Sequence, residues 1–176
     1  LINKVKSYNK FLNPDKLNKA YNFAVKAHKN QKRDSGDPYS NHPIAVASIL
    51  TELKLDSATI ATGLLHDTIE DTHATYENIK SEFGQEVADL VDGVTKISVF
   101  ENQATSTSKA ENFRKLILAT SKDIRVLLVK IADRLHNMRT IDAISKIEKK
   151  ERIAKETMEI YAPLADRMGM HSIRDE

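Results

Sequence analysis

The segment LLHDTIEDT, residues 64–72, constrains the fold of this chain more than any other stretch. It completes the apolar run 60–65, which predicts a packed helix, and then places the adjacent pair His66-Asp67 on that helix. Residues three and four positions apart are neighbours on a helix, so Glu70 should lie near this pair and Asp71 near Asp67. Four ionisable groups on a packed helix face are costly without a metal or partners. The alternative to a metal site is a solvated helix end. A lone histidine here would more often be a core or helix-end residue.

Two residues far away in the sequence complete a candidate metal site. His42 stands just before a proline, and Asp133 lies in the segment 131–140. With the His-Asp pair they make two imidazoles and two carboxylates, a mixed nitrogen and oxygen set that suits one borderline divalent metal. A metal held by one helical turn, with the acids Glu70 and Asp71 on the next, is an arrangement for activating water. Taken alone, His42 would more often be a helix cap or a surface histidine than a metal ligand.

The segment IADRLHNMRT, residues 131–140, predicts a helix with one polar face. Asp133, Asn137 and Thr140 are spaced by four and three and therefore share a face, opposite the apolar Ile131, Leu135 and Met138. That polar face could point to bulk water, or offer one metal ligand followed by hydrogen-bonding groups for a substrate. His136 is expected to point elsewhere, in a structural or exposed position. No role is assigned to the other histidines, His28, His73 and His171.

Basic side chains recur near these segments, and most of them fit the solvated faces of amphipathic helices. Arg33 is the exception, because it lies in the loop that leads to His42. A guanidinium there could stack on a base or pair with phosphate.

The hydrophobic pattern is helical nearly throughout and predicts one all-α domain over residues 1–176. Residues 31–41, with Ser-Gly-Asp-Pro, predict a loop. Residues 101–109 are polar and predict a mobile loop, after which helices resume at Phe113 and at Ile124. Pro163 should kink or end the last long helix. Other helices are expected to start at Asn13-Pro14, Pro43, Asp56 or Ser57, Thr75 and near Ile147.

Composition excludes several kinds of protein. The chain has no cysteine, which rules out disulfides, thiolate zinc sites and a cysteine nucleophile. Its formal net charge of +2 provides no bulk field for nucleic acid or membrane, so an anionic substrate would need a local basic cluster. No segment has the apolar length to span a bilayer, and the start lacks the apolar core of a signal peptide. These features predict a soluble, cytoplasmic protein.

Several segments, in this order along the chain, resemble a known family. They are RDSGDPY (33–39) leading into His42-Pro43, LHDTIEDT (65–72), VTK (94–96), AENFRK (110–115), ADRLHNMRT (132–140) and YAPLA (161–165). Together they resemble the hydrolase domain of the RelA/SpoT homologues, the enzymes of (p)ppGpp, within the wider HD phosphohydrolase superfamily. The resemblance covers about residues 20–170 and is far more specific than the His-Asp pair alone.

The resemblance implies a compact multi-helix HD-domain fold and a family reaction. That reaction removes the 3′-pyrophosphate from ppGpp or pppGpp and leaves GDP or GTP, in the turnover of the stringent-response alarmone. The resemblance implies that manganese is held by His42, His66, Asp67 and Asp133. It implies that the attacking water is activated by Glu70 and Asp71. It also implies a guanine-nucleotide site formed by Arg33, Ser35, Asn137 and Thr140.

Two features depart from the family pattern. Long members with both activities usually carry Arg-Lys-Ser-Gly where this chain has Arg33-Asp34-Ser35-Gly36, so Asp34 adds a negative charge beside the expected site. At about 4 Å one such charge contributes on the order of 1 kcal/mol in water. The chain also has no counterpart of the synthetase domain, and it is expected to be a cut-out domain, a split gene product or a stand-alone hydrolase.

Two alternatives to (p)ppGpp hydrolysis stay open. One is a related nucleotide phosphohydrolase, acting for example on NADPH, and the other is a catalytically weak domain that binds (p)ppGpp or regulates a partner. The expected ligands and acids are all present, which argues against decay, whereas Asp34 argues for it. Nucleic-acid binding is not expected, because there is no basic stripe with interleaved aromatics. No heptad pattern supports a dimer, and the oligomeric state stays open.

Overall fold

The fold is described from a computed structural model of the chain, over residues 1–10, 12–103 and 122–176. Helices account for all the regular structure of these residues, apart from one isolated bridge between Lys32 and Pro38. The prediction of an all-α fold is therefore confirmed. The elements are α1 (Ile2–Tyr8), α2 (Pro14–Ala27), α3 (Asn41–Glu52), α4 (Ser57–Leu65), α5 (Thr68–Asp71), α6 (Tyr76–Phe83), α7 (Gln85–Gln103), α9 (Arg125–Arg139), the 3₁₀ turn η1 (Ile141–Ala143), α10 (Ile147–Glu156), the π-helical turn η2 (Thr157–Tyr161), α11 (Ala162–Arg167) and α12 (His171–Asp175).

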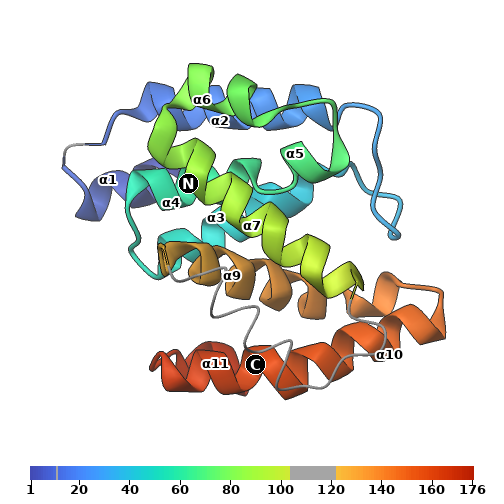
Figure 1. Cartoon of the computed structure of the whole chain (residues 1–176). Coiled ribbons are helices and arrows are strands. Elements are labelled where there is room, and N and C mark those ends of the chain that lie inside the picture. Colours follow the sequence, from blue (N-terminus) through green and yellow to red (C-terminus); the bar gives the residue numbers. More distant parts are fainter. Residues whose placement is uncertain (11, 104–121) are drawn as a thin grey trace.

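The helices form three tiers (Figure 1). The middle tier consists of α3, α4, α7 and α9, which pack against one another around the core. On one side α2 and α6 lie next to each other, where the rings of Phe23 and Phe83 meet edge to face at 5.5 Å. On the other side α10 and α11 run along α9 (Figure 1). The fully buried side chains of the middle tier include Val46, Leu50, Ile60, Leu64, Val91, Ile97 and Val129.

Three predicted helix starts are confirmed by their caps, whereas the helix predicted to start at Pro43 begins two residues earlier, at Asn41. The Asn13 side chain accepts a hydrogen bond from the backbone N–H of Asp15, with Pro14 at the first helical position. Asp56, rather than Ser57, caps α4 by accepting from the N–H of Thr59 at 3.2 Å. Thr75 and the third residue of α6 form a reciprocal capping box.

Gly63 lets α4 approach α3 closely, one helical turn before the His-Asp pair. A Cβ atom at this position would lie 2.6 Å from the Leu50 side chain and 3.4 Å from the backbone of Ala47. Real Cβ atoms do not come as close as 2.6 Å to a neighbour, so a larger residue would force the Leu50 side chain to shift. The glycine thereby lies at the contact between α4, which His66 follows, and α3, which has His42 in its first turn.

Three expectations are corrected. The His-Asp motif does not lie on one continuous helix, because α4 ends at Leu65 and α5 begins at Thr68. Residues 101–103 belong to α7 and not to a loop, while the rest of the predicted mobile loop and the helix expected at Phe113 lie outside the described residues. Of the two outcomes predicted for Pro163, an end of the last helix is wrong, since Pro163 occupies the first turn of α11 directly after the wider turn η2.

Candidate metal centre and adjoining cavities

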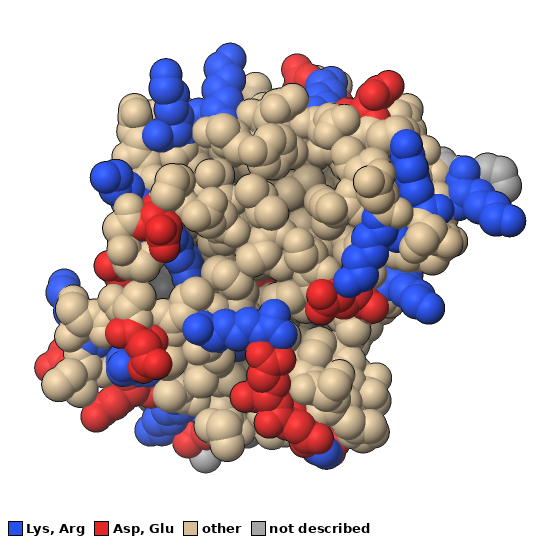
Figure 2. Space-filling view, turned by 180° about the vertical axis from the view of Figure 1, so that it is seen from behind, with Lys and Arg blue, Asp and Glu red and all other residues tan. Residues whose placement is uncertain are grey.

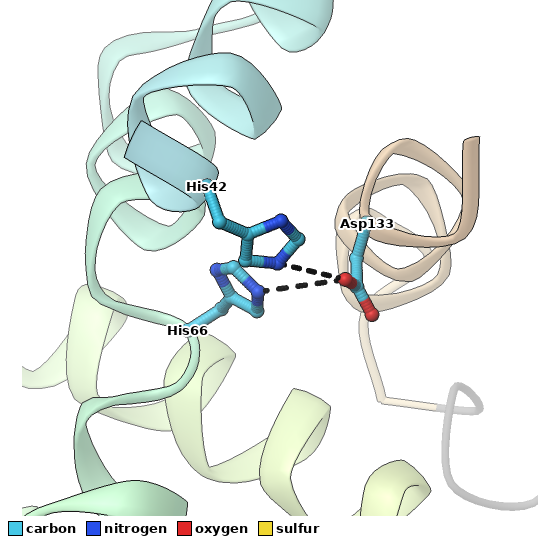
Figure 3. A group of neighbouring side chains, drawn as sticks. All are labelled: His42, His66 and Asp133. Carbon is cyan, nitrogen blue, oxygen red and sulfur yellow. Dashed lines mark ion pairs between the residues drawn. The ribbon is translucent and has the colours of Figure 1, made fainter. Parts of the chain in front are cut away.

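Three segments bring the predicted metal ligands together. His42 comes from the first turn of α3, His66 from the residue after α4, and Asp133 from the middle of α9. Figure 3 shows both imidazoles pointing at the carboxylate, with Nε2 of His42 and of His66 at 3.0 and 3.8 Å from Asp133 Oδ1. All three side chains are buried, and one ligand atom from each lies within 4.8 Å of the others.

Asp67 lies beside these three residues. Its Oδ1 is 3.1 Å from His66 Nε2, and its Oδ2 is 3.6 Å from His42 Nε2. The break between α4 and α5 makes this possible, because a residue in the turn can direct its side chain to the same point as its neighbour. The four residues predicted as ligands therefore gather around one point.

His66 is oriented as a metal ligand requires. Its Nδ1 lies 2.9 Å from the carbonyl oxygen of Gly63, which can only accept a hydrogen bond, so the ring proton resides on Nδ1. The lone pair of Nε2 then faces the cluster. This Nε2 is buried and makes no hydrogen bond within the described part of the chain. A buried nitrogen without a donor partner, surrounded by carboxylates, fits a bound cation.

The electrostatics of the cluster favour a positive charge. Burial lowers the pKa of His66, but Asp67 and Asp133 outweigh it and raise that pKa to about 10. Burial likewise opposes ionisation of Asp67, and the neighbouring His66 holds its pKa well below the usual range. Since both carboxylates stay ionised in the interior, they create a negative potential that a proton or a metal cation can neutralise.

The acids Glu70 and Asp71 lie at the open side of the cluster. Burial raises the pKa of both carboxyl groups, and the charge of Asp67 adds to the shift of each. Both residues are exposed, and both line a cavity of about 190 Å³ together with His42, Asp67 and Asp133. A carboxylate with a raised pKa accepts a proton more readily at neutral pH.

Tyr39 links Asp67 of the candidate metal site to Asp71, and the sequence did not single it out. Its hydroxyl lies 2.7 Å from Asp67 Oδ2 and 3.0 Å from Asp71 Oδ2. Burial and the two carboxylates raise the pKa of Tyr39 far above its usual value, so the hydroxyl keeps its proton and donates it between them. A tyrosine three residues before His42, in the loop of the Arg33 motif, was the available signal.

A second residue that the sequence did not assign is Lys130. The ammonium group is buried and contacts Ser98 Oγ at 2.9 Å, Glu101 Oε2 at 2.9 Å and Asp133 Oδ2 at 3.1 Å. Glu101 also pairs with Arg134 at 2.5 Å. Since Lys130 holds one oxygen of Asp133, the other oxygen is left to face the two imidazoles. The signal in the sequence was a lysine that interrupts an apolar run.

The polar face predicted on α9 accepts hydrogen bonds from the Arg33 side chain, which comes from the loop before α3. Arg33 Nη2 donates to Asn137 Oδ1 at 3.0 Å and to Thr140 Oγ1 at 3.2 Å. Asn137 Nδ2 in turn donates to Asp133 Oδ1 at 2.8 Å, so this face is connected to the candidate metal site. Ser35 lies nearby in the loop and donates to Asp37.

The expectation for His136 is wrong in one respect. This residue does not point away from the site, because its Nδ1 lies 2.8 Å from Nδ1 of His42. Burial, His42 and Arg33 lower the pKa of His136 to about 4, so the ring is neutral near pH 7. Helix geometry places His136 near Asp133, three residues earlier on α9, and the packing of α9 against α3 brings it to His42.

A second cavity, of about 350 Å³, adjoins the first. The two share Arg33, Tyr39, His42, Asn137 and Ile153 as lining residues. The larger cavity is also lined by Ser35, His136 and Thr140, and by the basic residues Lys32 and Lys149. All four residues predicted to bind a nucleotide, Arg33, Ser35, Asn137 and Thr140, thus border the same cavity.

The negative charge of Asp34 is compensated locally. Its Oδ2 pairs with Lys149 Nζ of α10 at 2.8 Å, which lowers the pKa of Asp34. Both residues line the larger cavity, so a cation from α10 stands beside the aspartate. Elsewhere charges are mixed: on the face in Figure 2, lysine and arginine side chains alternate with acidic ones around a broad uncharged area.

The fold and the cluster define a class of protein: a helical domain with a histidine and aspartate site able to hold a metal. Residues 20–171 match the HD domain family, and the chain belongs to this family. The match coincides with the extent predicted from the motifs. No helix in the described part of the chain has the length and apolar character that crossing a membrane requires.

Curated relatives narrow the family further. The chain is 54% identical over 176 residues, all of its length, to "GTP pyrophosphokinase rsh" of Brucella melitensis biotype 1, and covers 23% of that protein. It is 52% identical over 161 residues, 92% of its length, to "Guanosine-3′,5′-bis(diphosphate) 3′-pyrophosphohydrolase" of Escherichia coli O157:H7, again covering 23% of the relative. The chain therefore spans about a quarter of the length of these relatives.

A solved structure agrees with this placement. It is described as a metazoan ortholog of SpoT that hydrolyses ppGpp and plays a role in starvation responses. The two chains superpose with a TM-score of 0.64 at 30% identity, over 82% of this chain and 84% of the other. The chain is thus an HD domain of the RelA/SpoT homologue type.

Proposed function

We propose that this domain is a manganese-dependent (p)ppGpp hydrolase that removes the 3′-pyrophosphate, giving GDP or GTP and pyrophosphate. The observation that carries the proposal is the junction of two cavities at one cluster of imidazoles and carboxylates. Two relatives support the same reaction: a 3′-pyrophosphohydrolase at 52% identity and a ppGpp-hydrolysing SpoT ortholog at 30% identity.

The two cavities suit the two parts of such a substrate. The nucleoside would occupy the cavity of about 350 Å³, against the hydrogen-bonding groups of Arg33, Asn137 and Thr140. The 3′-diphosphate would then extend into the cavity of about 190 Å³, which Arg152 and Arg33 line together with the metal cluster. These arginines would provide the local positive charge that an anionic substrate needs, since the formal net charge of +2 provides no bulk field.

The metal would be held by His42, His66, Asp67 and Asp133. Two imidazoles and two carboxylates suit a borderline divalent ion such as manganese. Such an ion supplies Lewis-acid chemistry and neutralises phosphate charge when it is bound. Lys130 holds Asp133 in place, and the carbonyl of Gly63 fixes the His66 ring for this purpose.

The attacking water would lose its proton to Glu70 or Asp71. Both carboxyl groups line the smaller cavity, and burial raises the pKa of each. A base in this position is typically worth about 10²–10⁴-fold in rate. Tyr39 would keep Asp71 oriented beside the metal ligand Asp67, since its hydroxyl contacts both.

The direct test incubates the purified chain with ppGpp and manganese and measures GDP and pyrophosphate. Release of pyrophosphate that a chelator abolishes and manganese restores is the expected result. A panel with GTP, NADPH and other 2′- or 3′-phosphorylated nucleotides tests the substrate, and a panel with magnesium and zinc tests the metal. Bound manganese without pyrophosphate release from ppGpp would refute the proposal. Preferential hydrolysis of NADPH would establish instead that the domain is a phosphohydrolase of another nucleotide.

A further inference from the structure

Both ring nitrogens of His42 are engaged, and the second partner is another histidine. Nε2 faces the cluster, at 3.0 Å from Asp133 Oδ1. Nδ1 lies 2.8 Å from Nδ1 of His136, and the two ring centroids are 4.8 Å apart. His42 is buried, while His136 is partly exposed to the nucleotide-sized cavity.

A separation of 2.8 Å between two nitrogens leaves room for one hydrogen, so one ring donates and the other accepts. A metal ligand must offer a lone pair at Nε2, which places the proton of a neutral His42 ring on Nδ1. Nδ1–H of His42 then donates, and Nδ1 of His136 must accept. His136 therefore carries its own proton on Nε2.

The other imidazole ligand shows why this contact matters. Nδ1 of His66 faces the carbonyl of Gly63, which can never donate, so the backbone alone keeps the lone pair on Nε2. Within the described residues no carbonyl contacts Nδ1 of His42, and its tautomer depends on a side chain that can either donate or accept. Only an accepting His136 directs the His42 lone pair into the cluster.

We propose that His136 is a positioning residue for the metal site, which accepts the Nδ1 proton of His42 and so holds the Nε2 lone pair of His42 toward the metal. The inference rests on the proposed metal site and extends it to a residue outside the ligand set. Groups that hydrogen-bond the far nitrogen of a histidine ligand typically change metal affinity by about 10–100-fold. α9 then serves the metal twice, through Asp133 directly and through His136 by way of His42.

Two substitutions separate hydrogen bonding from packing. His136→Asn keeps an acceptor, because an amide oxygen can occupy the place of Nδ1, whereas His136→Leu fills the space without one. Manganese binding is measured by titration calorimetry on the whole chain, and thermal melting without metal checks that each variant folds. The matched control is His171→Leu, an exposed histidine on α12 that pairs with Asp166.

The expected result is that His136→Leu binds manganese about 10–100-fold more weakly, while His136→Asn and the control stay close to the unaltered protein. Nitrogen NMR of the rings, with zinc as a diamagnetic replacement, should place the His42 proton on Nδ1. Unchanged affinity in His136→Leu, or equal weakening in both His136 variants, would overturn the inference while leaving the metal site in place. An unaltered protein that binds no divalent ion would instead refute the metal site, and the inference with it.

Discussion

Replacing Lys130 by methionine should destabilise the domain strongly. The side chain is 6% exposed, and its ammonium group contacts Glu101 Oε2 at 2.9 Å and Asp133 Oδ2 at 3.1 Å. Methionine fills a similar volume but leaves these carboxylates without that cation in the interior. Removing one partner of a buried ion pair typically costs about 3–5 kcal/mol. Arg134 still contacts Glu101 at 2.5 Å, so a loss near the lower bound, about 3 kcal/mol, is expected.

The free energy of unfolding is measured by urea denaturation at pH 7 without metal. The matched control is Lys96→Met, since Lys96 pairs with Asp92 at 2.5 Å on the surface of α7 and its side chain is 63% exposed. Such a pair is worth at most about 0.5 kcal/mol. Manganese should reduce the loss in Lys130→Met, because a cation beside Asp133 replaces part of the missing charge. A loss below about 1 kcal/mol, as for a surface pair, would refute the proposed buried network.

Three further predictions concern the acids and a helix cap. Tyr39→Phe removes a hydrogen bond that lowers the pKa of Asp71, so the acidic limb of the rate–pH profile should move to higher pH, and an unmoved limb would contradict this role. Glu70→Ala should lose about 10²–10⁴-fold in rate with manganese binding retained, whereas Asp67→Ala should lose manganese binding, as calorimetry and activity assays can show. Asp56→Ala should cost about 1 kcal/mol in urea denaturation, because it removes the cap of α4. Burial opposes ionisation of Asp56, but Thr59 and its other partners lower the pKa, so this contribution is complete above about pH 4 and is lost as the pH falls through the folded-state value. Equal stability of Asp56→Ala and the unaltered protein at pH 7 would contradict the capping role.

Local features of the fold could be predicted because their causes are local. Asn13, Asp56 and Thr75 cap helices by binding backbone groups two or three residues away, and the spacing of Asp133, Asn137 and Thr140 places them on one helix face. A helix end or face is decided by residues within one turn, so the neighbouring sequence contains the information.

The break inside the His-Asp motif could not be predicted in the same way. Nothing in LLHDTIEDT, residues 64–72, excludes one continuous helix, because the segment contains no glycine and no proline. α4 nevertheless ends at Leu65, and the turn lets His66 and Asp67 direct their side chains to one point. The burial of the cluster between α3, α4 and α9 favours that turn, which is a tertiary effect.

The sequence by itself determined the helices and the motifs of the family, because hydrophobic period and capping depend on residues only a few positions apart. Only the tertiary structure shows which side chains meet. Arg125 and Lys130 both interrupt the apolar run 124–131. Arg125 nevertheless forms ion pairs at the surface with Asp56 and Glu86, while Lys130 is buried against Asp133. The tertiary structure likewise places His136 against His42, whereas the sequence predicted that His136 points away from the site. The physical reason is that burial and hydrogen-bond partners depend on how α3, α7 and α9 pack, and contacts between segments far apart in the chain leave no local pattern.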